Sequence, residues 1–456
     1  MRTLWWVKLT LALALFAVPA AAQGAACCSV QPAPLKPLDP IPAAASGASG
    51  HIDVDSATRA YLDQLPADKK ARSDAYFEGG YWLLLWDFLW SSAVCLLLLQ
   101  TGWSARMRDR AARVSVSSTV QTLLYWPQYL LAAAVLTLPL DWYEGWYREQ
   151  QYGMSNLTLG GWFGEAGKGF ALSLVLGAVA VTVLYALVRR MERTWWAWGA
   201  VATIVFGGII AMLGPVVISP IFNHPKPLTD QRVVAPILSM ARANGIDAKE
   251  VYEIDASKQT KRVSANVSGL GATMRITLND NLLARSSLPE IEAVMGHEMG
   301  HYVLNHVYKG LVMFGVLIVI GFALINAFYT RLIARNPAWG VRGIGDVAGL
   351  PLVVLLFGIY FFCITPVTNT IVRTQEYEAD IFGLNAARQP DGFARAALML
   401  SEYRKMEPGA LEEVIFYDHP SGRTRIHSAM RWKAEHPETW TPAPAAAAPA
   451  AAPPKP

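Results

Sequence analysis

The chain has 456 residues, enough for two or three ordinary domains. Charged residues make up 16% of it, against roughly 25% in typical soluble proteins, and hydrophobic residues make up 53%, which argues against a purely soluble protein. The formal net charge of +4 is small for this length and gives no reason to expect nucleic-acid binding.

The first two segments of the chain predict a membrane targeting element followed by a polar stretch. Residues 1–22 carry Arg2 and Lys8, an apolar run and then three alanines. This pattern is that of either a cleavable secretory signal or an uncleaved first membrane helix. Residues 23–78 are polar, rich in Pro and Ala, and lack a long apolar run, and the loop charges described below predict that they lie outside the cytoplasm.

Six further segments approach or exceed the ~20 apolar residues that span a bilayer. They lie at about 79–100, 121–140, 169–188, 195–222, 311–333 and 347–368. Any one of them could be a buried core helix, but six in one chain cannot all be the core of a soluble domain. The sequence therefore predicts an α-helical multi-pass membrane protein whose N-terminal membrane domain, 79–222, contains four helices.

A second domain is predicted over 223–433, with the helix pair 311–333 and 347–368 inserted into it. Its first part shows a helical pattern over about 229–244, stopped by Gly245. Three short β-like runs follow, at 251–254, 263–268 and 273–278. Ser287-Leu288-Pro289-Glu290 then begins a helix with a capping box. The domain is therefore α+β, and the Ala/Pro-rich tail, 434–456, is too poor in bulky apolar residues to fold.

The helix that begins after Ser287 carries the sequence His297-Glu298-Met299-Gly300-His301. Residues four apart share one helix face, so His297 and His301 can reach the same zinc ion. Glu298 lies about 100° round the helix, where it can take a proton from a bound water whose pKa the ion lowers towards ~7. A random match of this motif is expected in roughly one chain in a hundred. The sequence therefore predicts a zinc-dependent hydrolytic site.

A third protein ligand is expected, because catalytic zinc takes three and keeps its fourth position for water. Glu376 and Asp380 lie four apart on a predicted helix. If Glu376 binds the metal, Asp380 lies one turn further on and can accept a hydrogen bond from the outer nitrogen of a ligand histidine. An ordinary charged helix face explains the same spacing equally well, and Glu378 is expected to face elsewhere and be solvated.

The two motifs together, H-E-x-x-H and then E-x-x-A-D after two hydrophobic spans, resemble the type I CAAX prenyl protease family and more loosely the HtpX-like membrane proteases. The resemblance implies that Glu376 completes the zinc site. Residues 149–158, 220–228 and 264–270 also resemble family motifs, and residues that depart from them are Met154, Ser155, Ser264 and Asn266. Because of the last two departures, we expect the 264–270 strand to bind an extended peptide through its backbone.

The same resemblance singles out a histidine and an arginine six apart after the E-x-x-A-D helix. His419 and Arg425 match this spacing. The resemblance implies that they stabilise the oxyanion of a tetrahedral intermediate opposite the metal. Without the family, a histidine before a proline is most often a loop residue. The remaining histidines, among them His306, are interpreted as having no part in catalysis.

The sequence thus predicts a membrane-embedded endopeptidase with one zinc ion per chain, acting on extended peptides or membrane proteins. A transporter is the alternative from another class, and intramembrane Asp87 would mark its pathway; a non-catalytic scaffold is the other. The complete metallopeptidase motif set argues against both. The resemblance implies prenylated CAAX substrates, but the leader and the Ala/Pro tail are typical of bacteria, which are not expected to prenylate their own proteins. Membrane-protein quality control is then the better hypothesis, and the oligomeric state stays open.

Loop charges predict the orientation in the membrane, because Lys and Arg collect in cytoplasmic loops. Three alternate loops carry an excess of arginine: Arg106, Arg108, Arg110 and Arg113; Arg189, Arg190 and Arg193; Arg335 and Arg342. The intervening 141–168 loop is acidic overall. Placing the basic loops inside puts 223–309 and 369–456 outside. We therefore predict an inner-membrane protein of a bacterium whose catalytic domain faces the periplasm.

Overall fold

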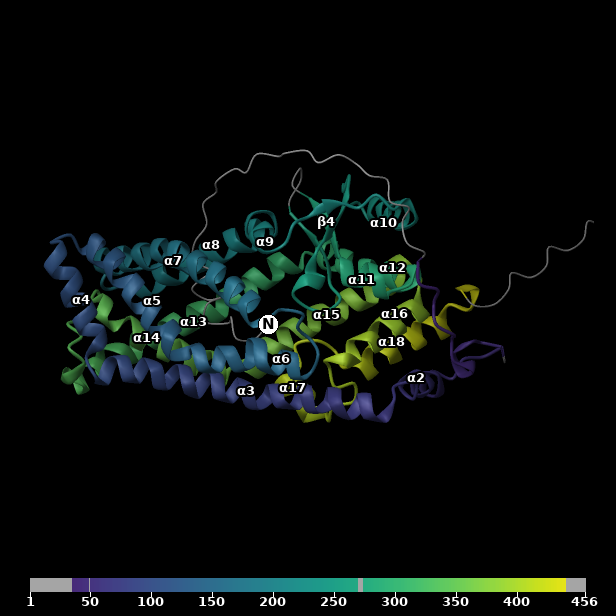
Figure 1. Cartoon of the computed structure of the whole chain (residues 1–456), viewed down its shortest axis with the longest axis horizontal. Coiled ribbons are helices and arrows are strands. Elements are labelled where there is room, and N and C mark those ends of the chain that lie inside the picture. The colour runs from purple at the N-terminus through teal and green to yellow at the C-terminus, as the bar shows by residue number, and fades with distance from the viewer. Residues whose placement is uncertain (1–34, 49, 270–273, 440–456) are drawn as a thin grey trace, which may run out of the picture.

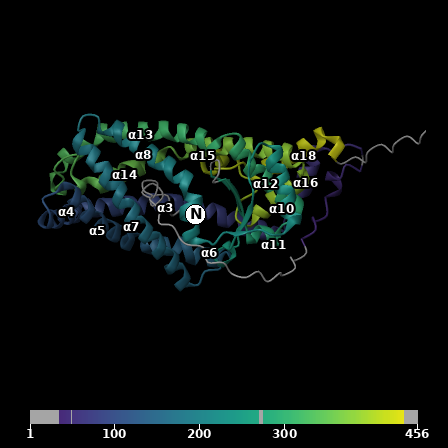
Figure 2. The same cartoon turned by 90° about the horizontal axis from the view of Figure 1, so that it is seen from above.

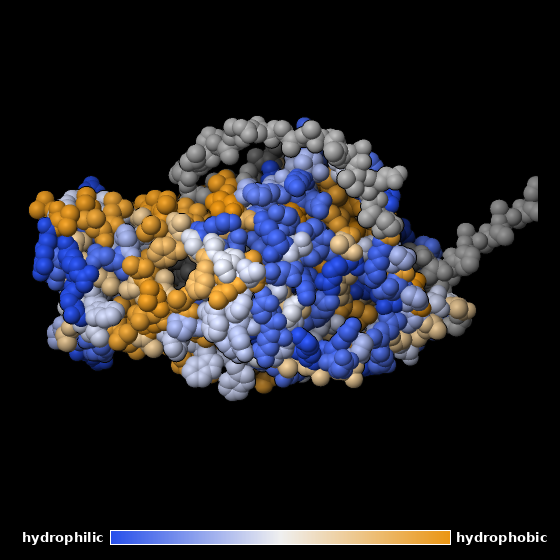
Figure 3. Space-filling view, viewed as in Figure 1, coloured by the Kyte–Doolittle hydropathy of each residue, from blue (hydrophilic) through white to orange (hydrophobic). Residues whose placement is uncertain are grey.

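The computed structural model of the chain describes residues 35–48, 50–269 and 274–439, and the predictions for 1–22 and for most of the tail lie outside these ranges. The molecule is elongated, with apolar helices along its length and an α+β unit at one end (Figure 1; Figure 2). On the face that Figure 3 shows, hydrophobic residues predominate over the helical part except at its outer end, and hydrophilic residues predominate over the α+β unit. This division matches the predicted fold class.

Four of the described helices are long and apolar enough to cross a membrane. They are α3 (Ala67–Gln100), α5 (Ser118–Trp142) with its continuation into α6 (Arg148–Gln151), α7 (Leu159–Arg190) and α13 (His306–Arg335). Each contains one of the six predicted segments. The first turns of α3 come from the end of the polar 23–78 stretch.

The other two predicted spans are interrupted, which corrects the sequence prediction of continuous helices. Residues 195–222 form α8 (Trp195–Leu213), a π-helical turn at Gly214–Ile218 and the short α9 (Ser219–Phe222). Residues 347–368 fall on α14 (Leu350–Cys363) and the start of α15 (Thr365–Ala387), and this pair is bent by 60°. Proline explains the bend, because Pro366 at the start of α15 has no backbone N–H to continue the helix of α14. If the bent pair is one span, the described chain holds five.

The loops that join the membrane helices at the end remote from the α+β unit are fastened to one another. The short helix α4 (Trp103–Val114) lies at this end (Figure 1). The guanidinium of Arg108 on α4 forms an ion pair with Asp346, and Arg189 donates 2.9 Å to the carbonyl oxygen of Gly345. The three arginine-rich loops therefore share one face of the molecule.

The α+β unit contains a four-stranded sheet in the order β1-β2-β4-β3. Its strands are β1 (Lys226–Pro227), β2 (Val251–Ile254), β3 (Ala265–Ser268) and β4 (Arg275–Asn279), of which β2 and β4 are parallel and the other neighbours antiparallel. The helices beside it are α10 (Gln231–Ala243), α11 (Asp280–Arg285) and α12 (Leu288–Val303). Buried Ile276 and Leu278 of β4 share a core with Met295 and Met299 of α12. The sheet therefore fixes the helix that carries H-E-x-x-H.

The polar segment before α3 is part of this unit. Its helix α2 (Val54–Leu62) contributes to a second core together with α16 (Pro390–Met399) and α18 (Gly422–Glu435). The buried ammonium of Lys433 donates 2.7 Å to the carbonyl oxygen of Ala45 and 2.6 Å to the carboxylate of Asp391, which also accepts from the hydroxyl of Tyr61 at 2.7 Å. The remaining helix, α17 (Ala410–Phe416), precedes α18.

Candidate metal centre

Helix α12 begins where the sequence predicts. The backbone N–H of Ser287 donates 2.6 Å to the side chain of Glu290, and the reciprocal half of the capping box is also present. Pro289 lies in the first turn, where its missing N–H costs nothing. The capped start sets the register of the helix and hence the direction in which its histidines point.

Small residues let α12 and α15 approach closely. Gly296 and Gly300 lie one turn apart on α12 and face Ala379 and Gly383 on α15. A Cβ at Gly296 would lie 2.9 Å from the carbonyl oxygen of Gly383, and one at Gly300 would lie 3.0 Å from the Cα of Ala379. Because neither position could hold a side chain without a shift, glycine here is what brings the carboxylates of α15 to the imidazoles of α12.

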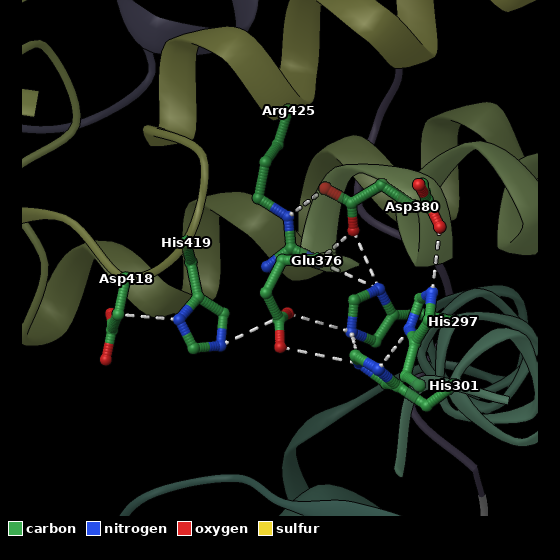
Figure 4. Close-up of polar contacts among 9 residues, drawn as sticks. His297, His301, Glu376, Asp380, Asp418, His419 and Arg425 are labelled. Carbon is green, nitrogen blue, oxygen red and sulfur yellow. Dashed lines mark hydrogen bonds and ion pairs between the residues drawn. The ribbon is translucent and has the colours of Figure 1, made fainter. Parts of the chain in front are cut away.

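His297, His301 and Glu376 converge on one point (Figure 4). The Nε2 of His297 lies 3.1 Å from the Nε2 of His301 and 3.3 Å from Oε2 of Glu376, while the Nε2 of His301 lies 3.4 Å from Oε1 of Glu376. Ligands at ~2.0–2.1 Å from a tetrahedral zinc ion lie roughly 3.3–3.4 Å apart. The three groups are therefore spaced as zinc ligands are.

The chemistry of these groups also fits zinc. Glu376 is buried among the imidazoles of His297, His301 and His419, so its carboxylate lies where a cation would offset its charge. Burial lowers the pKa of His301 to about 4, which keeps its imidazole neutral and able to bind metal. Burial acts in the same direction on His297, but hydrogen bonds to Asp380 and Glu376 outweigh it and raise its pKa to about 10. The acidic neighbours of His297 thus favour its protonated form when no metal is bound.

Asp380 lies behind His297, as the sequence predicts. Its Oδ1 is 2.7 Å from Nδ1 of His297, and its side chain is 1% exposed, so the contact is shielded from water. Arg425 lies against the same carboxylate, with Nε 2.9 Å from Oδ2 and Nη2 2.5 Å from Oδ1 (Figure 4). The structure thus places the Arg425 guanidinium on Asp380, with its Nη2 3.5 Å from Nδ1 of His297.

Glu298 lies beside the two histidines on α12 and is partly buried. Burial raises the pKa of Glu298 to about 7, with the charge of Glu376 adding to the effect. A carboxyl group with a pKa near neutrality can both accept and release a proton at physiological pH. The residue therefore has the properties of a general base.

His419 faces the same point from the loop between α17 and α18 (Figure 4). Its Nε2 lies 3.2 Å from Oε2 of Glu376, and its Nδ1 lies 2.9 Å from Oδ1 of Asp418. The side chain is 25% exposed, like that of His301, whereas His297 is 9% exposed. His419 and His301 therefore form the open side of the site. Asp418 was not identified from the sequence, where only its position next to His419 could have suggested it.

The sequence interpretation missed the contacts of His306, for which it predicts no part in catalysis. Glu378, which is expected to be solvated, is 42% exposed and nevertheless takes part in these contacts. In the structure Nδ1 of His306 lies 2.9 Å from Nδ1 of His301, and Nε2 of His306 lies 3.1 Å from Oε2 of Glu378. Lys309 donates 2.6 Å to the same carboxylate oxygen. The only sequence signal that could have pointed to this contact is the five-residue separation of His301 and His306.

Two family models match most of the chain. Residues 227–433 match the model of peptidase family M48, and residues 55–224 match the model described as CAAX prenyl protease N-terminal, five membrane helices. The first match contains every residue of the metal centre described above. The second contains the membrane helices from α3 to α8.

Named relatives agree with these matches. The metalloprotease YhfN of Bacillus subtilis, described as uncharacterized, is 32% identical over 338 residues, covering 74% of this chain and 79% of the relative. CAAX prenyl protease 1 of Saccharomyces cerevisiae is 26% identical over 332 residues, covering 68% of this chain and 72% of that protein. The crystal structure of S. mikatae Ste24p shares the fold, with a TM-score of 0.67 at 22% identity over 80% of this chain and 90% of that one.

Proposed function

This chain belongs to peptidase family M48 and is a multi-pass membrane metalloprotease, and from that premise we propose that its catalytic metal is one zinc ion held by His297, His301 and Glu376. The observation that carries the proposal is the convergence of these three groups at ligand spacing, with Glu298 beside them. The convergence also argues against a transporter or a scaffold with a degenerate site, because neither needs these groups together.

The residues around the ligands have separate tasks. When bound, zinc supplies the positive charge that makes a water molecule acidic near neutral pH and polarises the substrate carbonyl. Glu298 accepts the proton of the attacking water and returns it to the leaving amine. His419 donates to the oxygen that becomes negative in the tetrahedral intermediate. Asp380 accepts from Nδ1 of His297, and Arg425 holds Asp380, so that this ligand ring keeps its orientation.

The substrate backbone is proposed to pair with β3. This strand is at the edge of the sheet and is paired on one side only among the described strands, by β4. It lies alongside α12, so an extended peptide added to its free edge would run past the metal centre. The side chains of Ser264 and Asn266 differ from the family pattern, and backbone hydrogen bonds do not depend on them.

We propose that the natural substrates are membrane proteins or extended peptides cleaved for quality control in a bacterial inner membrane. The support is that the relative at 32% identity is bacterial, together with the leader and tail of this chain. CAAX processing is the second candidate, and the yeast relative's name favours it. Prenylated and unprenylated versions of one peptide separate the two, because only a CAAX protease requires the prenyl group.

The test of the site combines metal analysis with peptide cleavage by the purified protein. Wild type should hold one zinc per chain and cleave a quenched fluorescent peptide. Glu298→Gln should retain the zinc and lose roughly 10²–10⁴ in turnover, the usual contribution of a general acid–base group. Glu376→Ala should lose both zinc and turnover. Glu292→Gln, the same change on the same helix at a carboxylate that accepts from Gln389, is the control and should leave both unchanged. Loss of zinc from Glu298→Gln would refute its role as a proton carrier.

A further inference from the structure

We propose that His306 is a positioning residue for the metal ligand His301, and that Glu378 and Lys309 hold His306 in the one tautomer that this task requires. The proposal rests on the proposed zinc site, since it takes His301 to bind the metal through Nε2. It assigns a task to three residues that neither motif, H-E-x-x-H or E-x-x-A-D, specifies.

The direction of the hydrogen bonds carries the argument. A neutral imidazole that gives its Nε2 lone pair to a metal carries its proton on Nδ1. The Nδ1 of His301 must then donate across the 2.9 Å to Nδ1 of His306, which leaves the proton of His306 on Nε2. That nitrogen lies 3.1 Å from Oε2 of Glu378 and can donate to it. Each of these two hydrogen bonds then has one donor and one acceptor, and the series ends at the carboxylate of Glu378.

Lys309 completes the arrangement. Its ammonium group is 2.6 Å from the same Oε2 of Glu378 and comes from the first turn of α13, like His306 itself. Glu378 and Lys309 are both about two-fifths exposed, whereas the side chain of His306 is 3% exposed. The ion pair therefore closes the buried imidazole off from water and keeps an acceptor in place for its Nε2.

The backbone places His306 for this contact. Helix α12 ends at Val303 and α13 begins at His306, and Asn305 between them has φ 58°. Asparagine tolerates this left-handed conformation better than most residues. This break between the two helices brings the first side chain of α13 to the outer nitrogen of His301, which an uninterrupted helix would not do for a residue five positions on.

The two ligand histidines are thus supported in parallel ways. His297 donates from Nδ1 directly to Asp380, and His301 does so to Glu378 through His306. Glu376, Glu378 and Asp380 all lie on α15, so one helix supplies both the third ligand and the support for the other two. Such partners orient ligand rings, and their loss typically costs 10–100-fold in metal affinity.

The experiment measures zinc affinity and the rate of zinc release to a chromogenic chelator in full-length protein. His306→Leu keeps the bulk but has no acceptor, and should weaken zinc binding 10–100-fold. His306→Asn presents Oδ1 near the position of the lost Nδ1, and should restore affinity to within a few-fold of wild type. Glu378→Ala should give an intermediate loss. His224→Leu, at an exposed histidine outside the site, is the matched control and should behave as wild type.

Equal zinc affinity in wild type and His306→Leu would overturn the proposal, as would a His306→Asn variant no better than His306→Leu. Wild-type protein that binds no zinc would instead refute the proposed function, so the two failures are distinct. Unfolding temperatures of all variants, measured with chelator present, should agree with that of wild type; a loss of affinity that follows a loss of stability would reduce His306 to a packing residue.

Discussion

At the scale of single residues, His419 is the imidazole that reaches the centre from outside α12. Its Nδ1 contacts the carboxylate of Asp418, and its Nε2 lies on the open side of the site next to Glu376. This position is the basis of the proposal that His419 donates to the substrate oxygen and does not bind the metal.

We expect His419→Ala to lower turnover by about 10²–10³, the range for loss of one oxyanion donor, while zinc content stays at one per chain. Asp418→Asn should cost less, because an amide oxygen still accepts from Nδ1. Steady-state cleavage of a fluorescent peptide and metal analysis of the same samples measure both effects. Normal turnover in His419→Ala would show that His419 is a loop residue without a catalytic role.

Sequence reasoning works at this scale where a spacing has one geometric meaning. The four-residue separations of His297 from His301 and of Glu376 from Asp380 place side chains on one helix face, and the structure has them there. The contact between His301 and His306 depends on the left-handed backbone conformation of Asn305. The position of the Arg425 guanidinium depends on its ion pair with Asp380. Neither is encoded in a periodic pattern.

At the scale of elements, the N-terminal segment is built into the catalytic unit. Lys433 of α18 is buried, and its ammonium joins Ala45 to Asp391, while Tyr61 of α2 donates to the same carboxylate. A segment that looks like a polar linker in the sequence therefore has a defined attachment. Composition could not predict it, because one buried lysine is indistinguishable in sequence from an exposed one.

Lys433→Met should destabilise the catalytic unit by about 3 kcal/mol or more, because it leaves the Asp391 carboxylate without its cationic partner. Arg431→Met removes an exposed ion pair with Glu435 on the same helix and should leave stability almost unchanged. Thermal unfolding of the two variants, with limited proteolysis of residues 35–66, compares them. Equal shifts would mean that the buried contact adds nothing to stability.

The observed helix boundaries show where apolar runs fail to predict continuous helices. Four of the six runs correspond to helices of membrane-spanning length, while the runs at 195–222 and 347–368 are broken. In both, proline and glycine lie inside the apolar stretch, and hydropathy does not register the lost backbone donor. The H-E-x-x-H helix and the three strands were predictable because caps, turns and alternation all agree there.

At the scale of the whole molecule, the arginine-rich loops lie together at one end and the metal centre lies in the unit at the other (Figure 1). Their fastening by Arg108, Asp346 and Arg189 makes them one basic surface. This arrangement supports the proposal that the catalytic unit faces the periplasm, since basic surfaces stay in the cytoplasm.

Single cysteines test this orientation in a variant whose four natural cysteines are replaced. Lys249→Cys lies on the catalytic unit and Val116→Cys on the basic end, and both positions are exposed. An impermeant thiol reagent added to intact cells should label the first and spare the second. Labelling of Val116→Cys alone would place the protease in the cytoplasm, and disrupted cells should label both.

The bend between α14 and α15 joins a helix of the candidate metal centre to an apolar helix. One helix that leaves the metal centre, α13, starts at His306, and the helix that enters it, α15, continues from α14 across the 60° bend. Both connect the site to the hydrocarbon layer without an intervening linker. A bilayer whose thickness does not match these helices makes them tilt, and the tilt would move the supports of both ligand histidines. Zinc release measured in lipids of increasing chain length should therefore vary with hydrophobic thickness.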